Sequence, residues 1–108
     1  MEAALSPDVV FRSPAVFTPY EGRESVMRLL RNAVEVFQDF EYTDELKGEG
    51  THALIFRANV ADKQVEGLDH LTLDADGLVT ELVVMVRPLS GLIALAQEMG
   101  ARLETTPG

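Results

Sequence analysis

The sequence of 108 residues contains no cysteine and no tryptophan, and it has few basic side chains. The absence of cysteine excludes disulfides, thiol nucleophiles and cysteine metal sites, and it leaves the redox compartment open. Nine lysines and arginines stand against 18 aspartates and glutamates, which gives a net charge of −9. A chain this acidic repels phosphate backbones and anionic membrane surfaces at long range, which argues against nucleic-acid and membrane partners.

Long apolar runs are missing as well. No stretch approaches the roughly 18 residues of a membrane span, and the opening MEAALSPD lacks the basic and apolar regions of a secretory signal. We therefore expect a soluble, cytoplasmic protein. The length fits one small domain, and a content of 46% hydrophobic and 25% charged residues fits a folded one.

Two kinds of periodicity divide the chain. A short β-prone run over residues 8–14 is followed, from Arg23 to Phe37, by apolar side chains at the spacing of one helical face. From Phe40 to Val86 the period becomes two, with short interruptions, which predicts four strands in an antiparallel meander. After Pro88 the helical spacing returns.

The order of strand, helix, four strands and helix predicts an α+β fold in a single domain, residues 1–108. Its economical packing is one curled antiparallel sheet with helices on one face. We expect residues 104–108 to form a flexible tail.

Three segments resemble the nuclear transport factor 2-like superfamily, in particular its SnoaL-like and ketosteroid-isomerase-like members. They are LSPDVVFRSP, YEGRESV and LDHLTLDADGLVTEL, and the match covers roughly Leu5 to Pro88. The resemblance implies a cystatin-like cone, in which a strongly bent sheet wraps around helices and encloses an apolar pocket. It also implies a small hydrophobic or carbonyl ligand.

The sequence departs from the family pattern in two places. Family members usually begin with a helix of several turns that closes the cone and can carry a catalytic tyrosine, and residues 1–7 hold only a remnant of it. In the isomerases an aspartate directly before a proline is the general base, and Ser13 stands there instead. A serine hydroxyl cannot replace a carboxylate as a base at neutral pH, which argues against steroid-type isomerisation by the family's mechanism.

Asp69 is the candidate catalytic acid. On its predicted strand it shares a face with Val65 and Leu71, so it should point inward, where an unpartnered carboxylate is costly. The resemblance agrees, because the matching aspartate of the isomerases is a pocket carboxylic acid, kept neutral to donate a hydrogen bond to an oxyanion. Desolvation should raise the pKa of Asp69 above about 3.9. The alternative is an aspartate at the pocket mouth, solvated or paired with a backbone donor or an arginine.

Other side chains are candidates for ligand binding. By alternation Asp44 lies in line with Tyr42, and together with Asp69 they would supply the few convergent polar groups of an apolar cavity. An inward charge near a sheet edge can equally serve to prevent edge-to-edge aggregation. The other predicted lining residues are Ser13, Phe56, Leu71, Leu82 and Val84.

The two histidines give no signal of metal binding or catalysis. His70 alternates to the face opposite Asp69, and we interpret it as a surface or interface residue. His52 opens a strand without an apparent partner, and the two histidines lack ligand spacing. We therefore predict neither a metal nor another cofactor.

Two functions remain open. One is a cofactor-independent isomerase or cyclase, in which Asp69 acts as the acid on a small hydrophobic carbonyl compound. The other is a non-catalytic, dimeric ligand-binding or accessory domain of the same fold, which the serine at position 13 favours. The apolar side chains of Ile55, Val83 and Met85 on the outer sheet face predict a homodimer through that face.

Overall fold

The computed structural model describes residues 4–105, and the side chains of residues 4–103. The elements are β1 (Leu5–Arg12), β2 (Tyr20–Glu21), α1 (Arg23–Val36), β3 (Gln38–Lys47), β4 (Thr51–Val60), β5 (Lys63–Leu73), β6 (Val79–Arg87) and α2 (Leu89–Thr105). The predicted α+β class and the order of its elements are confirmed, with the two-residue strand β2 as an addition. No helix within the described residues is long and apolar enough to span a bilayer.

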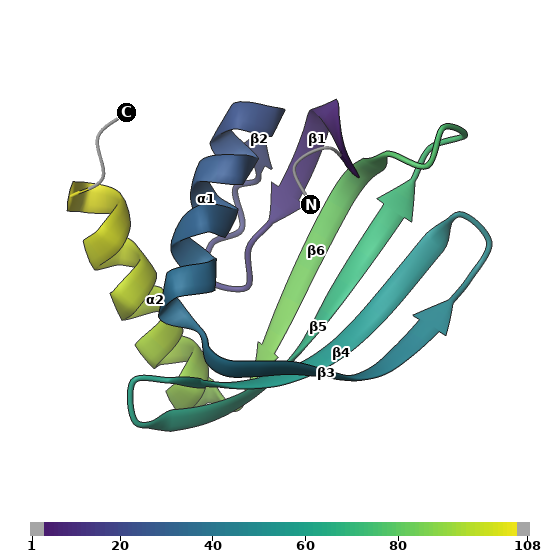
Figure 1. Ribbon diagram of the computed structural model, residues 1–108. Helices are drawn as coiled ribbons and strands as arrows, with labels where there is room; N and C mark the ends of the chain where they lie inside the picture. Colours follow the sequence, from purple (N-terminus) through teal and green to yellow (C-terminus); the bar gives the residue numbers. More distant parts are fainter. Residues whose placement is uncertain (1–3, 106–108) are drawn as a thin grey trace.

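All six strands form one bent sheet in the order β2–β1–β6–β5–β4–β3 (Figure 1). Strands β3 to β6 form the predicted antiparallel meander. The expectation of a wholly antiparallel sheet is wrong at β1, which runs parallel to β6 with Phe11 opposite Leu82. A parallel pair needs a long crossover, and α1 with the first three strands of the meander supplies it.

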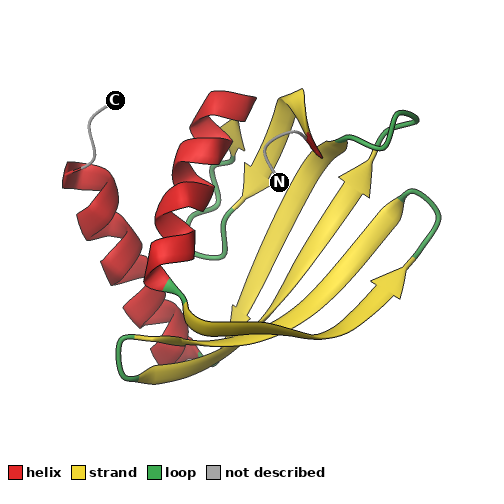
Figure 2. Cartoon of the chain, viewed as in Figure 1, coloured by secondary structure: helices red, strands yellow, loops and turns green. Residues whose placement is uncertain are grey.

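Both helices lie on the same side of the sheet, where the bend makes it concave (Figure 2). Helix α1 packs on β1, and α2 packs on β5 and β6. The apolar positions of α1 recur every three or four residues, so one stripe, with Val26, Leu29 and Val36, is buried. This arrangement covers only part of the concave face, because every residue of β3 is exposed.

The core has two parts. The first lies between α1, β1 and β6, and its buried residues are Leu5, Val9, Phe11, Val26, Met27, Leu29, Leu71, Val79 and Leu82. The second lies beneath α2, and its buried residues are Val36, Ala58, Val60, Val65 and Leu95. Asp69 follows Val65 and precedes Leu71 on the same strand, so it lies between the two parts.

Two predictions about the chain ends need correction. Residues 5–7, predicted as part of a helix remnant, belong to β1, where Leu5 is fully buried and pairs with Val79. Residues 1–3 of that predicted remnant lie outside the described residues. The predicted tail 104–108 begins inside α2, which extends to Thr105, and residues 106–108 lie outside the described residues.

Candidate ligand-binding site

Asp69 lies in the middle of β5 and faces the concave side of the sheet. Its cross-strand neighbours are Leu54 of β4 and Val84 of β6. The strand alternation predicted this orientation, because the side chains that share the face are apolar. Phe56, Leu71 and Leu82 are buried on this face, and Asp69 itself is half-buried.

Tyr42 of β3 is the polar partner of Asp69. It lies opposite Phe56 in the strand register, and its hydroxyl forms a hydrogen bond with the Asp69 carboxylate. Burial raises the pKa of Asp69 to about 6, and the hydrogen bond from Tyr42 offsets this only in part. The pKa of Tyr42 is also raised, first by burial and then by the charge and the hydrogen bond of Asp69.

An aromatic cluster continues the concave face beside this pair. Phe40 stacks on Phe56 with 4.8 Å between the ring centroids, and Phe37 meets Phe56 edge-on at 5.5 Å. Tyr42 packs edge-on against Phe40 at 4.9 Å. The face is thus a hydrophobic surface with a carboxyl group and a phenol at its centre, and half of the Tyr42 side chain is exposed.

The predicted inward placement of Asp44 is wrong. The register of β3 shifts between Tyr42 and Asp44, so that Asp44 lies opposite Ile55 on the outer face and Glu45 lies opposite Leu54 on the concave face. A β-bulge of this kind inserts one extra residue and reverses the faces of all residues that follow. Simple alternation in the sequence cannot reveal it.

The same bulge creates a polar cluster that the sequence analysis missed. Glu45 Oε2 lies 3.2 Å from Nε2 of His52, and its Oε1 lies 3.7 Å from Nζ of Lys47. His52, read from the sequence as having no partner, faces the concave side opposite Leu71. The described residues contain no group of three or more side chains that could hold a metal ion.

Ser13 lies just beyond the end of β1. Its predecessor Arg12 pairs with Val83, so Ser13 is level with Val84 and therefore with Asp69, two strands away. Its hydroxyl accepts a hydrogen bond from the backbone N–H of Ala15 at 3.0 Å, which shapes the turn. The predicted roles in ligand binding of Ser13 and of the apolar lining residues stay predictions.

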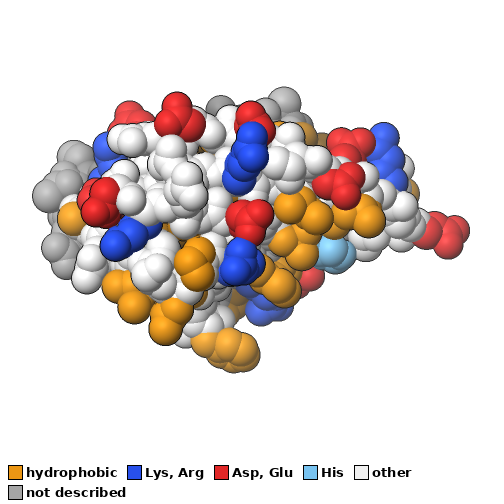
Figure 3. Space-filling model, turned by 90° about the horizontal axis from the view of Figure 1, so that it is seen from below, with side chains coloured by type: hydrophobic (Ala, Val, Ile, Leu, Met, Phe, Trp, Pro, Cys, Tyr) orange, Lys and Arg blue, Asp and Glu red, His pale blue; other side chains and the backbone are white. Residues whose placement is uncertain are grey.

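The outer face of the sheet carries a charged row and an apolar patch (Figure 3). In the charged row Glu41, Arg57, Glu66 and Arg87 alternate across four strands, with ion pairs between Arg57 and Glu41 and between Arg87 and Glu66. The outer apolar patch consists of Ala53, Ile55, Leu68, Val83 and Met85, and His70 lies between Ala53 and Val83. His70 therefore faces away from Asp69, as predicted.

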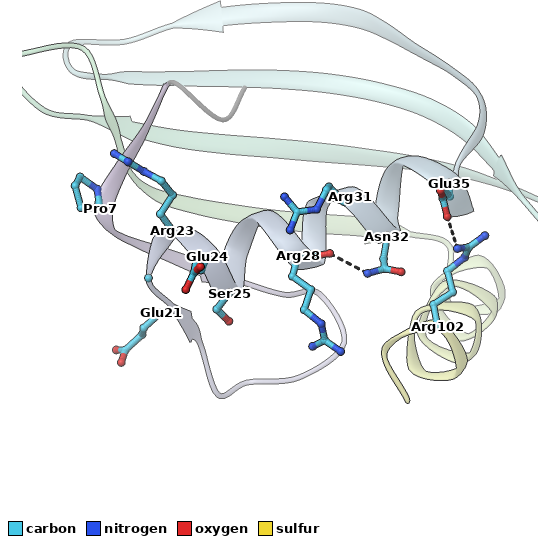
Figure 4. Close-up of a pocket in the computed structure, with 11 residues that line it drawn as sticks. Pro7, Glu21, Arg23, Glu24, Ser25, Arg28, Arg31, Asn32, Glu35 and Arg102 are labelled. Atoms are coloured by element: carbon cyan, nitrogen blue, oxygen red, sulfur yellow. Dashed lines mark hydrogen bonds and ion pairs between the residues drawn. The ribbon is translucent and has the colours of Figure 1, made fainter. Parts of the chain in front are cut away.

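Two surface grooves lie away from the concave face. One, of about 1070 Å³, runs along α1 and is lined by arginines and glutamates (Figure 4). Several of its charged side chains have structural partners: Arg23 donates to the Leu5 carbonyl, and Arg102 pairs with Glu35. The other, of about 560 Å³, is lined in part by the charged row. Neither groove includes Asp69 or Tyr42.

Comparison with known proteins places this geometry in a family. No protein-family model matches the chain, and neither does any curated protein. Among solved structures, a steroid delta-isomerase from Pseudomonas aeruginosa is 40% identical, over 96% of this chain and 77% of its own, with a TM-score of 0.93. The chain belongs to the nuclear transport factor 2-like superfamily.

Two further structures extend the likeness. An uncharacterized bacterial protein with a cystatin-like fold, from Silicibacter pomeroyi, is 32% identical over 96% of this chain and 74% of its own, with a TM-score of 0.94. A structure described as a SnoaL-like polyketide cyclase, from a Jannaschia species, is 16% identical over 87% and 74%, with a TM-score of 0.73. The latter shows the fold alone. The resemblance inferred from the sequence is confirmed for this nuclear transport factor 2-like protein.

Proposed function

We propose that this nuclear transport factor 2-like protein binds a small hydrophobic compound with a carbonyl group on the concave face of its sheet. The observation that carries the proposal is Asp69, half-buried on an otherwise apolar strand face and hydrogen-bonded to Tyr42. A few convergent polar groups on an apolar surface orient a bound ligand. The apolar part of the compound would cover Leu54 and Val84, which are partly exposed.

The protonation state of Asp69 would decide how it meets a carbonyl group. A carbonyl oxygen only accepts hydrogen bonds, so the carboxyl group must be protonated to donate one. With a pKa of about 6, roughly a tenth of the Asp69 side chains are protonated at pH 7. A neutral carbonyl ligand would select this fraction, and its apparent affinity would fall as the pH rises through the pKa.

The proposal extends to chemistry through the comparison with the steroid delta-isomerase. An acid that donates to a carbonyl oxygen stabilises the negative charge that develops there when a neighbouring carbon loses a proton. Asp69 would serve in this way in cofactor-independent isomerase or cyclase-type chemistry. Ser13 supports the second candidate function, a non-catalytic ligand-binding or accessory domain, because a serine there provides no carboxylate base.

The binding proposal is tested with androst-4-ene-3,17-dione, a rigid hydrophobic ketone, by equilibrium dialysis at pH 5 and pH 8. We expect the wild type to bind more weakly at pH 8, by up to about 100-fold if only the protonated form binds. Asp69→Asn should bind with no such pH dependence. The matched control is Asp44→Asn, on the outer face of β3, which should behave as the wild type. Equal binding by Asp69→Asn and the wild type at both pH values would refute the role of Asp69.

The two candidate functions separate in a turnover assay. With androst-5-ene-3,17-dione, an isomerase converts the unconjugated ketone to the conjugated enone, which is followed by ultraviolet absorbance. Turnover by the wild type that is lost in Asp69→Asn supports the enzyme. Binding without turnover supports the ligand-binding domain.

A further inference from the structure

We propose that His52, oriented by Glu45, is the proton acceptor of the concave face. The inference rests on the proposed binding of a carbonyl compound beside Asp69, and it supplies the base that the serine at position 13 does not. It would allow this chain to move a proton on its ligand with residues from β3 and β4 instead of the turn after β1.

The contact between the two residues sets the orientation of the imidazole ring. Nε2 of His52 lies 3.2 Å from Oε2 of Glu45 and is shielded from solvent, although its geometry falls short of a well-aligned hydrogen bond. A carboxylate at this nitrogen favours the tautomer with the proton on Nε2. The lone pair is then on Nδ1, and this is the nitrogen that would accept a proton from a ligand. Glu45 reaches this position because the bulge in β3 places it on the concave face.

The strand register makes His52 of β4 and Asp69 of β5 diagonal neighbours on the same face of the sheet. Asp69 lies opposite Leu54, and His52 lies opposite Leu71, two residues further along the same pair of strands. Such diagonal neighbours are about 7–8 Å apart. A ligand that lies over the partly exposed Leu54 would therefore have the acid on one side and the imidazole on the other. This separation suits a carbonyl oxygen at one end and an acidic C–H bond a few atoms away.

Among the side chains that the structure describes, few other charged groups surround His52. Glu45 and Lys47 face it from β3, and Lys47 lies directly opposite it in the register, with its own ammonium group 3.7 Å from Glu45. From β5 the nearest titratable group on the same face is Asp69, which holds Tyr42 as its partner. The site therefore contains two separate groups, one of acid and phenol and one of imidazole, carboxylate and ammonium.

The proton transfer balances without a further reactant. Nδ1 of His52 takes a proton from a carbon next to the carbonyl group, and the electron pair of that C–H bond forms a carbon–carbon double bond. The C=O pair moves onto the oxygen, where protonated Asp69 donates a hydrogen bond. The imidazolium then returns the proton to the far end of the resulting dienolate, and neutral His52 is restored.

The test combines turnover of androst-5-ene-3,17-dione with binding of androst-4-ene-3,17-dione. Loss of a general base typically costs a factor of 10² to 10⁴, so we expect His52→Gln to lower kcat by at least about 100-fold while binding persists. His70→Gln, on the outer face, is the matched control and should keep the wild-type rate. Glu45→Gln should lower kcat at an unchanged KM, and Glu45→Asp should restore part of it. The half-exposed Glu45 also provides a folded variant should His52→Gln unfold.

The possible outcomes distinguish a failure of this inference from a failure of the binding proposal. Retained turnover in both His52→Gln and Glu45→Gln, with binding intact, would overturn the role of His52 and leave the carbonyl site standing. The inference would also be overturned by a wild-type protein that binds androst-4-ene-3,17-dione but neither isomerises androst-5-ene-3,17-dione nor exchanges its α-protons with deuterated water. Absence of binding by the wild type would refute the carbonyl site, and the inference with it.

Discussion

At the scale of single residues, the ring of Phe56 lies directly against the backbone of Gly67. A Cβ atom at position 67 would come within 2.1 Å of the ring, and Phe56 is only 1% exposed, so the ring has no room to move away. Gly67 lies two residues before Asp69 and thereby lets the aromatic cluster approach the acid. Glycine inside a strand often marks such a close approach of another group.

We predict that Gly67→Ala lowers the free energy of unfolding by about 1–3 kcal/mol, because the added methyl group overpacks the concave face. Gly100→Ala is the matched control. It lies in α2 with open space around the added atom, and it should raise stability by up to about 1 kcal/mol. Urea denaturation at pH 7 measures both. Equal stability of Gly67→Ala and the wild type would mean that the ring does not occupy this position.

The raised pKa of Asp69 has a consequence for stability. Its carboxyl group has a pKa of about 6 in the folded protein against 3.8 ordinarily, so the folded state binds the proton more tightly than the unfolded state. The charged form then costs stability, and the cost grows as the pH rises from about 4 to about 6. By linkage the full cost is about 3 kcal/mol.

We therefore predict that Asp69→Asn is as stable as the wild type, or slightly less stable, near pH 4, and more stable at pH 7. The gain should reach up to about 3 kcal/mol, less whatever the hydrogen bond of Tyr42 loses with a neutral partner. Urea denaturation of both proteins between pH 4 and pH 8 gives the difference. A difference that does not change with pH would contradict the buried acid.

At this scale much of the site could be predicted from the sequence. Strict alternation holds along β5, so an aspartate among apolar residues had to face inward. The sequence could name Tyr42 only as a candidate for the same site as Asp69. The distance between the two side chains depends on β4, which lies between their strands. Gly67 was visible as a glycine on the same face, but the ring that requires it comes from another strand.

At the scale of elements, bulges decide which face a residue occupies. Two register shifts in β3, between Gln38 and Glu41 and between Tyr42 and Asp44, bend the edge strand and exchange its faces. The sequence pattern has no mark for the extra residue, so Asp44 was placed inward and Glu45 outward. The pair of Glu45 and His52 could not be found for the same reason. The parallel position of β1 was also hidden, since it depends on a partner about 70 residues away.

Helix α2 holds the second part of the core through one stripe of side chains. Leu95 is 6% exposed and packs with Val65 and Ala58, whereas Ile93, two residues earlier, is 48% exposed. We predict that Leu95→Ala lowers the free energy of unfolding by about 2–5 kcal/mol, because it leaves a cavity between α2 and the sheet. Ile93→Ala, the control, should change it by less than about 1 kcal/mol. Urea denaturation measures both changes in stability. Similar losses of stability in both variants would mean that α2 does not pack on the sheet through Leu95.

At the scale of the whole molecule, the outer apolar patch is the surface proposed for a second copy of this chain. It is bordered by the charged row, and Met85 on its β6 side is 57% exposed. Apolar surface of this extent on a sheet face usually marks a contact site. The alternating charges of the row would allow two identical faces to meet with opposite signs opposed.

We predict a dimer by light scattering at micromolar concentration, and a monomer for the double variant Val83→Lys and Met85→Lys, because four buried charges would oppose association. Val34→Lys is the control, since Val34 is a 75% exposed apolar residue on α1, away from the patch. It should remain dimeric. A wild-type protein that is monomeric at this concentration would contradict the proposed interface.

The architecture as a whole followed from the sequence more closely than its details. The change of hydrophobic period from helix to meander and back, together with the family motifs, was enough to predict the bent sheet and its two helices. The extent to which the helices cover the concave face could not be predicted from the sequence. Strand β3 is exposed along its length although its sequence contains Phe40, Tyr42 and Leu46. Coverage depends on which elements pack over a strand, and local periodicity does not carry that information.

The most direct test of the account is an NMR titration of the Asp69 carboxyl carbon between pH 3 and pH 9, in the wild type and in Tyr42→Phe. Burial on the concave face should give a midpoint of about 6 in the wild type. Removal of the Tyr42 hydroxyl should raise the pKa further, because that hydrogen bond stabilises the charged form. A midpoint that Tyr42→Phe leaves unchanged would contradict the hydrogen bond between the two residues. A wild-type midpoint at or below the ordinary value of 3.8 would show that Asp69 is solvated or ion-paired and would contradict the site proposed for the concave face.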